Sequence, residues 1–160
     1  NDFGDILKIP EFKVDEEVPT VPGLIGAKMS KSYGNTIDIF CTEKELKKAT
    51  SKIVTDSTPM EESKDFSTCN VYALAKLFLE NDEVVALQQR YAKGGEGYGH
   101  FKAYLQGLIW NYFEEARDKR AYYLAHEDEV FAILDNGASK ARIIAQEKMK
   151  LIREVVGIYR

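Results

Sequence analysis

The chain contains few of the residues that build metal sites or disulfide frameworks. Its 160 residues include two cysteines, Cys41 and Cys69, and two histidines, His100 and His126. No CxxC pair occurs, and these four residues do not follow the spacing of a structural zinc site. Two cysteines far apart in sequence are typical of a reducing compartment. We therefore predict no metal site and a cytoplasmic location.

Long apolar runs and an excess of positive charge are also missing. No apolar run is long enough to cross a bilayer and no secretory signal opens the sequence, so we expect no membrane contact. The net charge of −4 and the pI of about 5.3 argue against a protein that coats nucleic acid. A local basic patch would still permit RNA binding. Because the sequence starts without methionine in "NDFGDILKIPEF", we expect the C-terminal portion of a longer protein.

The residues that are present predict a mainly α-helical fold. Hydrophobic residues make up 44% of the chain, which is enough for a core. Thr42 followed by Glu45 forms a capping box, which predicts a helix that reaches Ile53. Apolar residues at the helical period predict further helices over 70–80, 82–91, 99–125, 128–134 and 139–156. Gly94-Gly95 is expected to end the helix over 82–91, and Asn136-Gly137 the helix over 128–134.

The first forty residues follow a different pattern from the rest. They are irregular up to about residue 26, with a short β-like run over 18–21, and continue in a loop over 27–36 that is rich in lysine and serine. Residues 42–158 are expected to form a helical bundle. Trp110 lies in the apolar stripe of the helix over 99–125, which favours core packing over base stacking.

The stretch "GAKMSKSYGN" over 26–35 carries the strongest chemical signal. Lys28 and Lys31 lie three residues apart between glycines, with Ser30 and Ser32 beside them. Two ammonium groups on such a loop can close over a polyphosphate, each ion pair contributing roughly 4 kcal/mol before desolvation. Serine hydroxyls and backbone N–H groups add hydrogen-bond donors. A solvated charged turn is the alternative interpretation for an arbitrary string of this kind.

The string 28–32 reads KMSKS, which resembles the second signature of the class I aminoacyl-tRNA synthetases. Four later segments, "IVTDST", "CNVYALAKLF", "GYGHFK" and "GASKARIIA", resemble the bacterial tryptophanyl-tRNA synthetase family in the same order and at similar spacing. The resemblance covers nearly the whole chain from Val18 onward. It implies that the chain holds the last piece of a Rossmann catalytic domain over 1–40 and a helical anticodon-binding domain over 41–160.

The resemblance also implies roles for the loop. Lys31 would stabilise the pyrophosphate that leaves ATP and Lys28 would assist, so these two lysines are the expected catalytic residues. The ATP- and phosphate-binding residues implied are Lys28, Met29, Ser30, Lys31 and Ser32. Met29 is expected to pack inward as an anchor, while Gly26 and Gly34 absorb the backbone changes of loop closure. ATP with Mg²⁺, tryptophan and tRNA(Trp) are the implied substrates and partners, and the full-length family member acts as a homodimer.

The chain departs from the family pattern at two points. The first signature of the family, His-x-Gly-His, is absent, because His100 and His126 are too far apart to form it. We therefore expect the chain to hold half of an active site and to be inactive alone. Ile25 stands where the family often has an acidic residue, which removes a polar contact there. His100 is predicted to be structural, and "GGEGYG" over 94–99 a connection between helices, since it misses the G-x-G-x-x-G register.

Basic residues that could read tRNA are scattered along the helices and interleaved with acids. The family role favours a few Lys or Arg side chains at one end of the bundle, and Lys102, Arg117 and Arg142 are our candidates. Most of the other basic residues are expected to form solvated helix faces.

Three alternatives remain on the sequence alone. A tyrosyl-type class I synthetase shares the loop, although it lacks "VTDS" and "GYGxFK". A non-catalytic tRNA-binding module could keep the helices and a relic loop. A plain helical bundle with a coincidental KMSKS would require the four later segments to match by chance.

Overall fold

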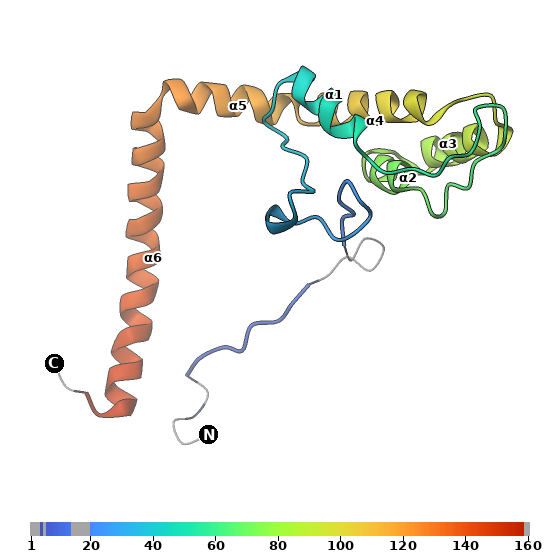
Figure 1. Cartoon of the computed structure of the whole chain (residues 1–160). Helices are drawn as coiled ribbons and strands as arrows, with labels where there is room; N and C mark the ends of the chain where they lie inside the picture. Colours follow the sequence, from blue (N-terminus) through green and yellow to red (C-terminus); the bar gives the residue numbers. More distant parts are fainter. Residues whose placement is uncertain (1–3, 5, 14–19, 159–160) are drawn as a thin grey trace. The chain divides into compact units, whose positions relative to one another are not determined.

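The computed structural model describes residues 4, 6–13 and 20–158, and this part is mainly helical (Figure 1). By its internal contacts the chain divides into two units, one of Asn1–Val14 with Lys119–Arg160 and one of Asp15–Asp118. The boundary falls within α5 (Glu114–Ala125). The domain border expected at residues 40 and 41 lies inside the larger unit and stays a prediction. None of the helices in the described ranges is long and apolar enough to cross a membrane.

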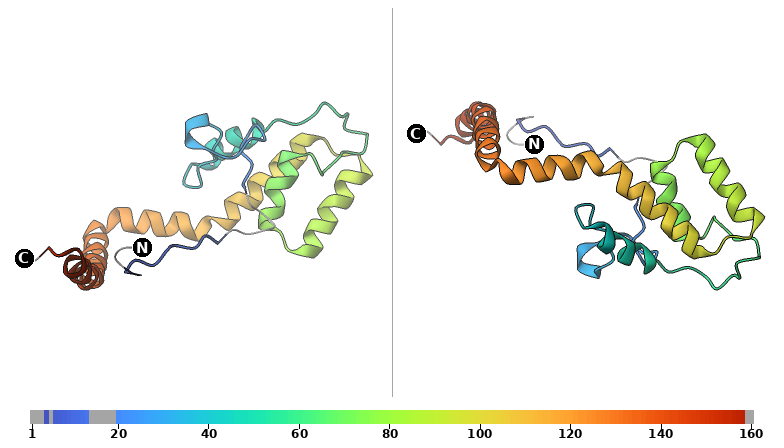
Figure 2. Two further views of the ribbon diagram at one scale, coloured as in Figure 1. Left: turned by 90° about the horizontal axis from the view of Figure 1, so that it is seen from below. Right: turned by 90° about the horizontal axis from the view of Figure 1, so that it is seen from above.

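Four helices build the core of the larger unit. They are α1 (Glu43–Ser51), α2 (Asn70–Ala75) with its 3₁₀ extension η2 (Lys76–Phe78), α3 (Asn81–Lys93) and α4 (Tyr98–Tyr112). Helices α1 and α2 both pack on α4, and Figure 2 shows α2 and α3 beside it. The buried apolar side chains are Leu46, Ile53, Cys69, Val71, Tyr72, Leu74, Ala75, Leu87, Tyr91, Phe101, Leu105 and Ile109. The mainly α fold class is confirmed.

Two local predictions at helix ends are confirmed. Thr42 and Glu45 form the capping box at the start of α1, where each side chain accepts the other residue's backbone N–H. Helix α3 ends at Gly94, whose φ of +70° lies in the region that favours glycine. A Cβ at Gly94 would also lie 2.5 Å from the carbonyl oxygen of Glu61. This position therefore requires glycine for both conformation and space.

One predicted helix changes type and another is interrupted. The helix expected over 70–80 is an α-helix to Ala75, continues as the 3₁₀ turn η2 to Phe78 and has Leu79 as its C-cap, while Glu80 caps α3. The helix expected over 99–125 breaks at Phe113 into α4 and α5. At this break the Arg117 guanidinium donates to the carbonyl of Trp110 at 2.5 Å, which satisfies an acceptor at the end of α4. The apolar period runs through the break unchanged, so the sequence pattern does not reveal it.

The last two predicted helices form one helix. Helix α6 (Glu127–Val156) runs through Asn136 and Gly137, so the prediction of a stop at this pair was wrong. Gly137 does not have a positive φ, and one glycine in a helix costs only about 1 kcal/mol relative to alanine. Good helix formers on either side, including Ala132, Ala138 and Ala141, offset that cost. The helix ends instead at Gly157, with φ of +78°.

Two segments were predicted to be irregular or β-like rather than helical. The loop expected over 55–68 is confirmed, since no helix or strand occurs there. The β-like run over 18–21 lies partly outside the described residues. In the described part, Pro22 and Lys28 form one isolated antiparallel bridge.

Candidate active site

The lysine-serine loop begins as a small hairpin. Val21 accepts a hydrogen bond from the N–H of Met29 at 2.9 Å, and the Gly23 N–H donates to Ala27 at 2.7 Å. The hairpin turns at Gly26, whose φ is +84°. A Cβ there would lie 2.9 Å from the side-chain amide of Asn70 at the start of α2. Gly26 therefore lets the turn approach the helical core closely.

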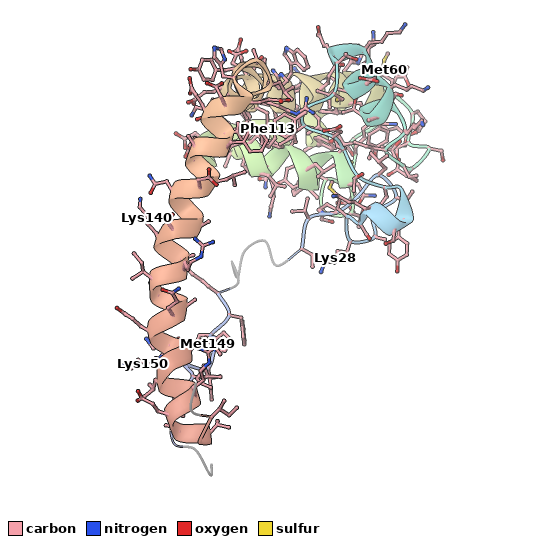
Figure 3. The ribbon with its side chains drawn as sticks, turned by 90° about the vertical axis from the view of Figure 1, so that its left-hand side faces the viewer. Lys28, Met60, Phe113, Lys140, Met149 and Lys150 are labelled. Atoms are coloured by element: carbon pink, nitrogen blue, oxygen red, sulfur yellow. The ribbon has the colours of Figure 1, made fainter. Side chains whose placement is uncertain are left out.

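The second half of the loop is a 3₁₀ turn, η1 (Lys31–Tyr33). The N–H of Tyr33 donates to Ser30, and the N–H of Gly34 donates to Lys31. Gly34 closes the turn with φ of +60°. Lys28 and Lys31 are both exposed, and the position of Lys28 is visible in Figure 3. The backbone thus presents two ammonium groups from one short loop to solvent.

Met29 connects this loop to the helical core. Its half-buried side chain lines an apolar cavity of about 300 Å³ with residues before and after the loop and from α2, η2 and α4. The other lining residues are Val21, Ile37, Ile39, Leu74, Leu77, Phe78, Ile109, Tyr112 and Phe113. This packing agrees with the inward anchor expected of Met29, and its part in ATP binding stays a prediction.

Asn35 is a residue of the loop for which the sequence pattern predicted no role. It is buried, and its side chain bonds to the backbone of Ser30, Lys28 and Ala27. The signal available in the sequence was an asparagine directly after the glycine that ends the turn. That signal gives no sign of burial, because burial depends on segments before the loop.

Two of the family-like segments meet in space. The Tyr98 hydroxyl of "GYGHFK" donates to Asp56 of "IVTDST" at 2.9 Å. Hydrogen bonds from Thr58, with a further one from Tyr98, lower the pKa of Asp56. Burial, and then the bond to Asp56, raise the pKa of Tyr98 to about 12. This pair joins the start of α4 to the loop after α1.

Lys64 holds the same loop from inside. It is 4% exposed, and its ammonium donates to the carbonyls of Pro59, Met60 and Glu62 at 2.9, 3.2 and 3.0 Å. It also lies 5.6 Å from the centre of the Tyr98 ring. A buried charge is tolerated here because three acceptors surround it. The loop over 55–68 is therefore an ordered part of the helical unit.

The three candidate tRNA-reading residues lie in different settings. Lys102 donates to the carbonyl of Ser51 at 3.1 Å. Arg117 lies 3.7 Å from the centre of the Trp110 ring and also donates to the Trp110 carbonyl. Arg142 is exposed on α6, in the smaller unit. Contacts within the protein thus already engage Lys102 and Arg117, and RNA binding by all three stays a prediction.

Three further residues have defined positions. Trp110 is half-buried and packs against the core, as predicted. His100 is exposed in the first turn of α4, where its N–H donates to Gly97. Ile25 is 60% exposed at the tip of the hairpin.

Comparisons with known proteins support one family. The family described as tRNA synthetases class I (W and Y) matches residues 6–114. A tryptophan–tRNA ligase of Campylobacter jejuni is 56% identical over 99% of this chain, and one of Fusobacterium nucleatum is 43% identical over 96%. The chain spans about half the length of these relatives, 50% and 47% respectively.

A solved structure agrees with these relatives. The crystal structure of tryptophanyl-tRNA synthetase from Campylobacter jejuni, complexed with ADP and tryptophan, matches 97% of this chain with a TM-score of 0.85. The match covers 49% of that structure's chain, at 56% identity. The two-lysine loop and the matched helices together show that the chain belongs to the class I tRNA synthetases of the tryptophan and tyrosine type.

Proposed function

We propose that the chain is the C-terminal part of a tryptophan–tRNA ligase, which activates tryptophan with ATP and transfers it to tRNA(Trp). The observation that carries this proposal is the exposed pair Lys28 and Lys31 on a loop anchored to a helical core. The tryptophan–tRNA ligases among the relatives favour tryptophan over tyrosine as the substrate.

The chemistry proposed for the loop is electrostatic. A carboxylate oxygen of tryptophan attacks the α-phosphorus of ATP, the bond to the bridging oxygen breaks, and its electrons leave with pyrophosphate. Lys31 stabilises the charge that builds on pyrophosphate, and Lys28 assists. One well-placed donor typically contributes about 3–4 kcal/mol to such a transition state. Ser30 and Ser32 add donors for phosphate oxygens.

Magnesium would enter with ATP as the MgATP substrate, held by phosphate oxygens. The loop offers ammonium and hydroxyl groups, which fit the phosphates. No group of three or more His, Cys, Asp or Glu that could hold a metal occurs in the described ranges. In this proposal the lysines and serines of the loop bind the phosphates of MgATP.

The proposal gives the helices behind the loop a role in binding the anticodon of tRNA(Trp). Lys102, Arg117 and Arg142 are the candidate contacts, and Arg142 is the exposed one that no described contact engages. The full-length enzyme would be a cytoplasmic homodimer, as expected for this family.

The test is amino-acid-dependent exchange of pyrophosphate into ATP by the full-length protein. We expect exchange with tryptophan and not with tyrosine.

Lys31→Ala should lower kcat about 100- to 1,000-fold, the range found when one such donor is removed. Lys44→Ala, which changes an exposed lysine on α1, is the matched control. The 160-residue chain alone should show no exchange, because it lacks the His-x-Gly-His signature. Exchange with tyrosine, or an unchanged Lys31→Ala variant, would contradict the proposal.

A further inference from the structure

Asn35 is a buried polar residue at the base of the lysine-serine loop. It is 2% exposed, yet its carboxamide makes hydrogen bonds with three backbone groups of the loop. Its Oδ1 accepts from the N–H of Ser30 at 2.8 Å. Its Nδ2 donates to the carbonyls of Lys28 at 3.2 Å and Ala27 at 3.5 Å. One side chain therefore holds the backbone on both sides of Met29.

The chemistry of these contacts selects a carboxamide. The loop offers one N–H donor and two carbonyl acceptors, so the side chain must accept at one end and donate at the other. Aspartate has the same shape and could accept from Ser30, but its carboxylate would face the two carbonyl oxygens without a proton to donate. Alanine would remove the partner of the Ser30 N–H and the Lys28 carbonyl, while the Ala27 carbonyl would still accept from the Gly23 N–H. Losing these hydrogen bonds weakens the hold on the loop backbone, which opens a route for the loop to rearrange.

The opposite side of the site is shaped around Asn35. A Cβ added to Gly23 would lie 2.4 Å from its Nδ2 and 2.5 Å from its Cγ. The backbone carbonyl of Asn35 accepts from the N–H of Leu24 at 3.1 Å, which fixes the residue from the same side. Gly23 therefore provides the space that Asn35 occupies. The hairpin that begins the loop and Asn35 near the loop's end thus pack against each other.

We propose that Asn35 is a positioning residue for the amino-acid activation step: its carboxamide holds the loop backbone so that Lys28 and Lys31 are presented to the phosphates of ATP. The lysine side chains are exposed and long, so the backbone that carries them sets where their charges lie. Asn35 does not itself touch the substrate in this proposal. The activation step rests on the function proposed above, whereas the holding of the loop does not.

The first experiment measures tryptophan-dependent pyrophosphate exchange by the full-length protein with Asn35→Asp. We expect kcat per active site, counted by active-site titration, to fall at least tenfold, with the KM for tryptophan within twofold of the original. Asn136→Asp, at an exposed position of α6, is the matched control and should leave both values unchanged. A merely structural role would lower the number of active sites and leave kcat per site intact. That result would overturn the proposal.

The second experiment does not depend on activity. Amide hydrogen exchange of the 160-residue chain is compared between the original sequence and Asn35→Ala. We expect the Ser30 amide to exchange at least tenfold faster, while the amides in the middle of α4 keep their rates. An unchanged Ser30 rate would overturn the proposal even if the enzyme were impaired. If the loop loosens but the original full-length protein does not activate tryptophan, the proposed function fails and the role of Asn35 in holding the loop stands.

Discussion

At the scale of single residues, a hydrogen bond between distant segments links two titratable groups. Asp56 and Tyr98 lie 2.9 Å apart, and each changes the pKa of the other in the direction that favours the bond. The pKa of Asp56 is lowered, so its contribution to stability is present above the ordinary aspartate range and is lost as the pH falls through the lowered value. The pKa of Tyr98 is raised to about 12, so its contribution to stability is fully present below the ordinary tyrosine pKa. This contribution is lost as the pH rises from there through the folded value of about 12.

This pair predicts a difference at alkaline pH. The free energy of unfolding of the chain should fall between about pH 10, where an unperturbed tyrosine ionises, and about pH 12, where folded Tyr98 does. In Tyr98→Phe this fall should be smaller, because the ring has no proton to lose. Urea unfolding at a series of pH values measures it. Tyr33→Phe, which changes a tyrosine that is 72% exposed, is the control. An alkaline loss in Tyr98→Phe equal to that of the original chain would contradict the expectation.

At the scale of secondary-structure elements, α6 continues through a residue pair that is only a weak predictor of a helix end. Its Asn136-Gly137 pair resembles a helix end, but the helix continues to Val156. The helix ends at Gly157, where two backbone hydrogen bonds close the last turn. There the N–H of Ile158 donates to Arg153 at 2.9 Å and the N–H of Gly157 to Glu154 at 3.3 Å. These bonds satisfy carbonyls of the last turn, which nothing at Gly137 requires.

Gly137 within α6 and Gly157 at its C-cap therefore predict opposite effects of alanine. A Cβ at Gly137 would meet nothing within 4 Å and the residue has helical backbone, so Gly137→Ala should stabilise α6 by about 0.5–1 kcal/mol. Gly157→Ala should destabilise the helix end, because its φ of +78° strains any residue with a Cβ. Hydrogen exchange of the α6 amides measures both variants. Slower exchange in Gly157→Ala, or faster exchange in Gly137→Ala, would show that the backbone argument is wrong.

At the scale of the whole molecule, an acidic chain must bind an acidic ligand if the proposed function holds. The net charge is −4, so binding of tRNA has to use local groups of basic residues rather than the overall field. Several of them lie on α6, where Lys140 and Lys150 project from the helix in Figure 3. Others, including Lys102, lie in the larger unit.

The anticodon-binding role proposed for the helices predicts that the chain distinguishes tRNAs by their anticodon. At fixed salt, the 160-residue chain should bind tRNA(Trp) at least about tenfold more tightly than the same tRNA with its anticodon replaced, since each base stacked on a protein contributes about 1–3 kcal/mol. Salt is held constant because phosphate contacts make affinity strongly dependent on it. Filter binding or fluorescence anisotropy measures the two affinities. Equal affinities would mean that this chain does not read the anticodon by itself.

Several local features of this protein could be predicted from its sequence, although the helix stop predicted at Asn136-Gly137 was wrong. The capping box of Thr42 and Glu45 and the glycine end of α3 both follow from hydrogen bonds within a few residues, so spacing reveals them. The residues of the lysine-serine loop were also evident, because five consecutive positions carry the family signature. The helical class followed from the apolar period over most of the chain.

Contacts between distant segments were decided only by the tertiary structure. Burial of Asn35 depends on the space beside Gly23, and the bond between Asp56 and Tyr98 spans 42 positions. The break at Phe113 leaves the apolar period intact, so the sequence does not indicate it. In the folded chain it is marked by the hydrogen bond from Arg117 to the Trp110 carbonyl. The sequence by itself thus determined which groups the loop carries and where most helices begin. Packing decided how that loop is held. Asn35 can hold it only once the fold has buried this side chain in the space beside Gly23.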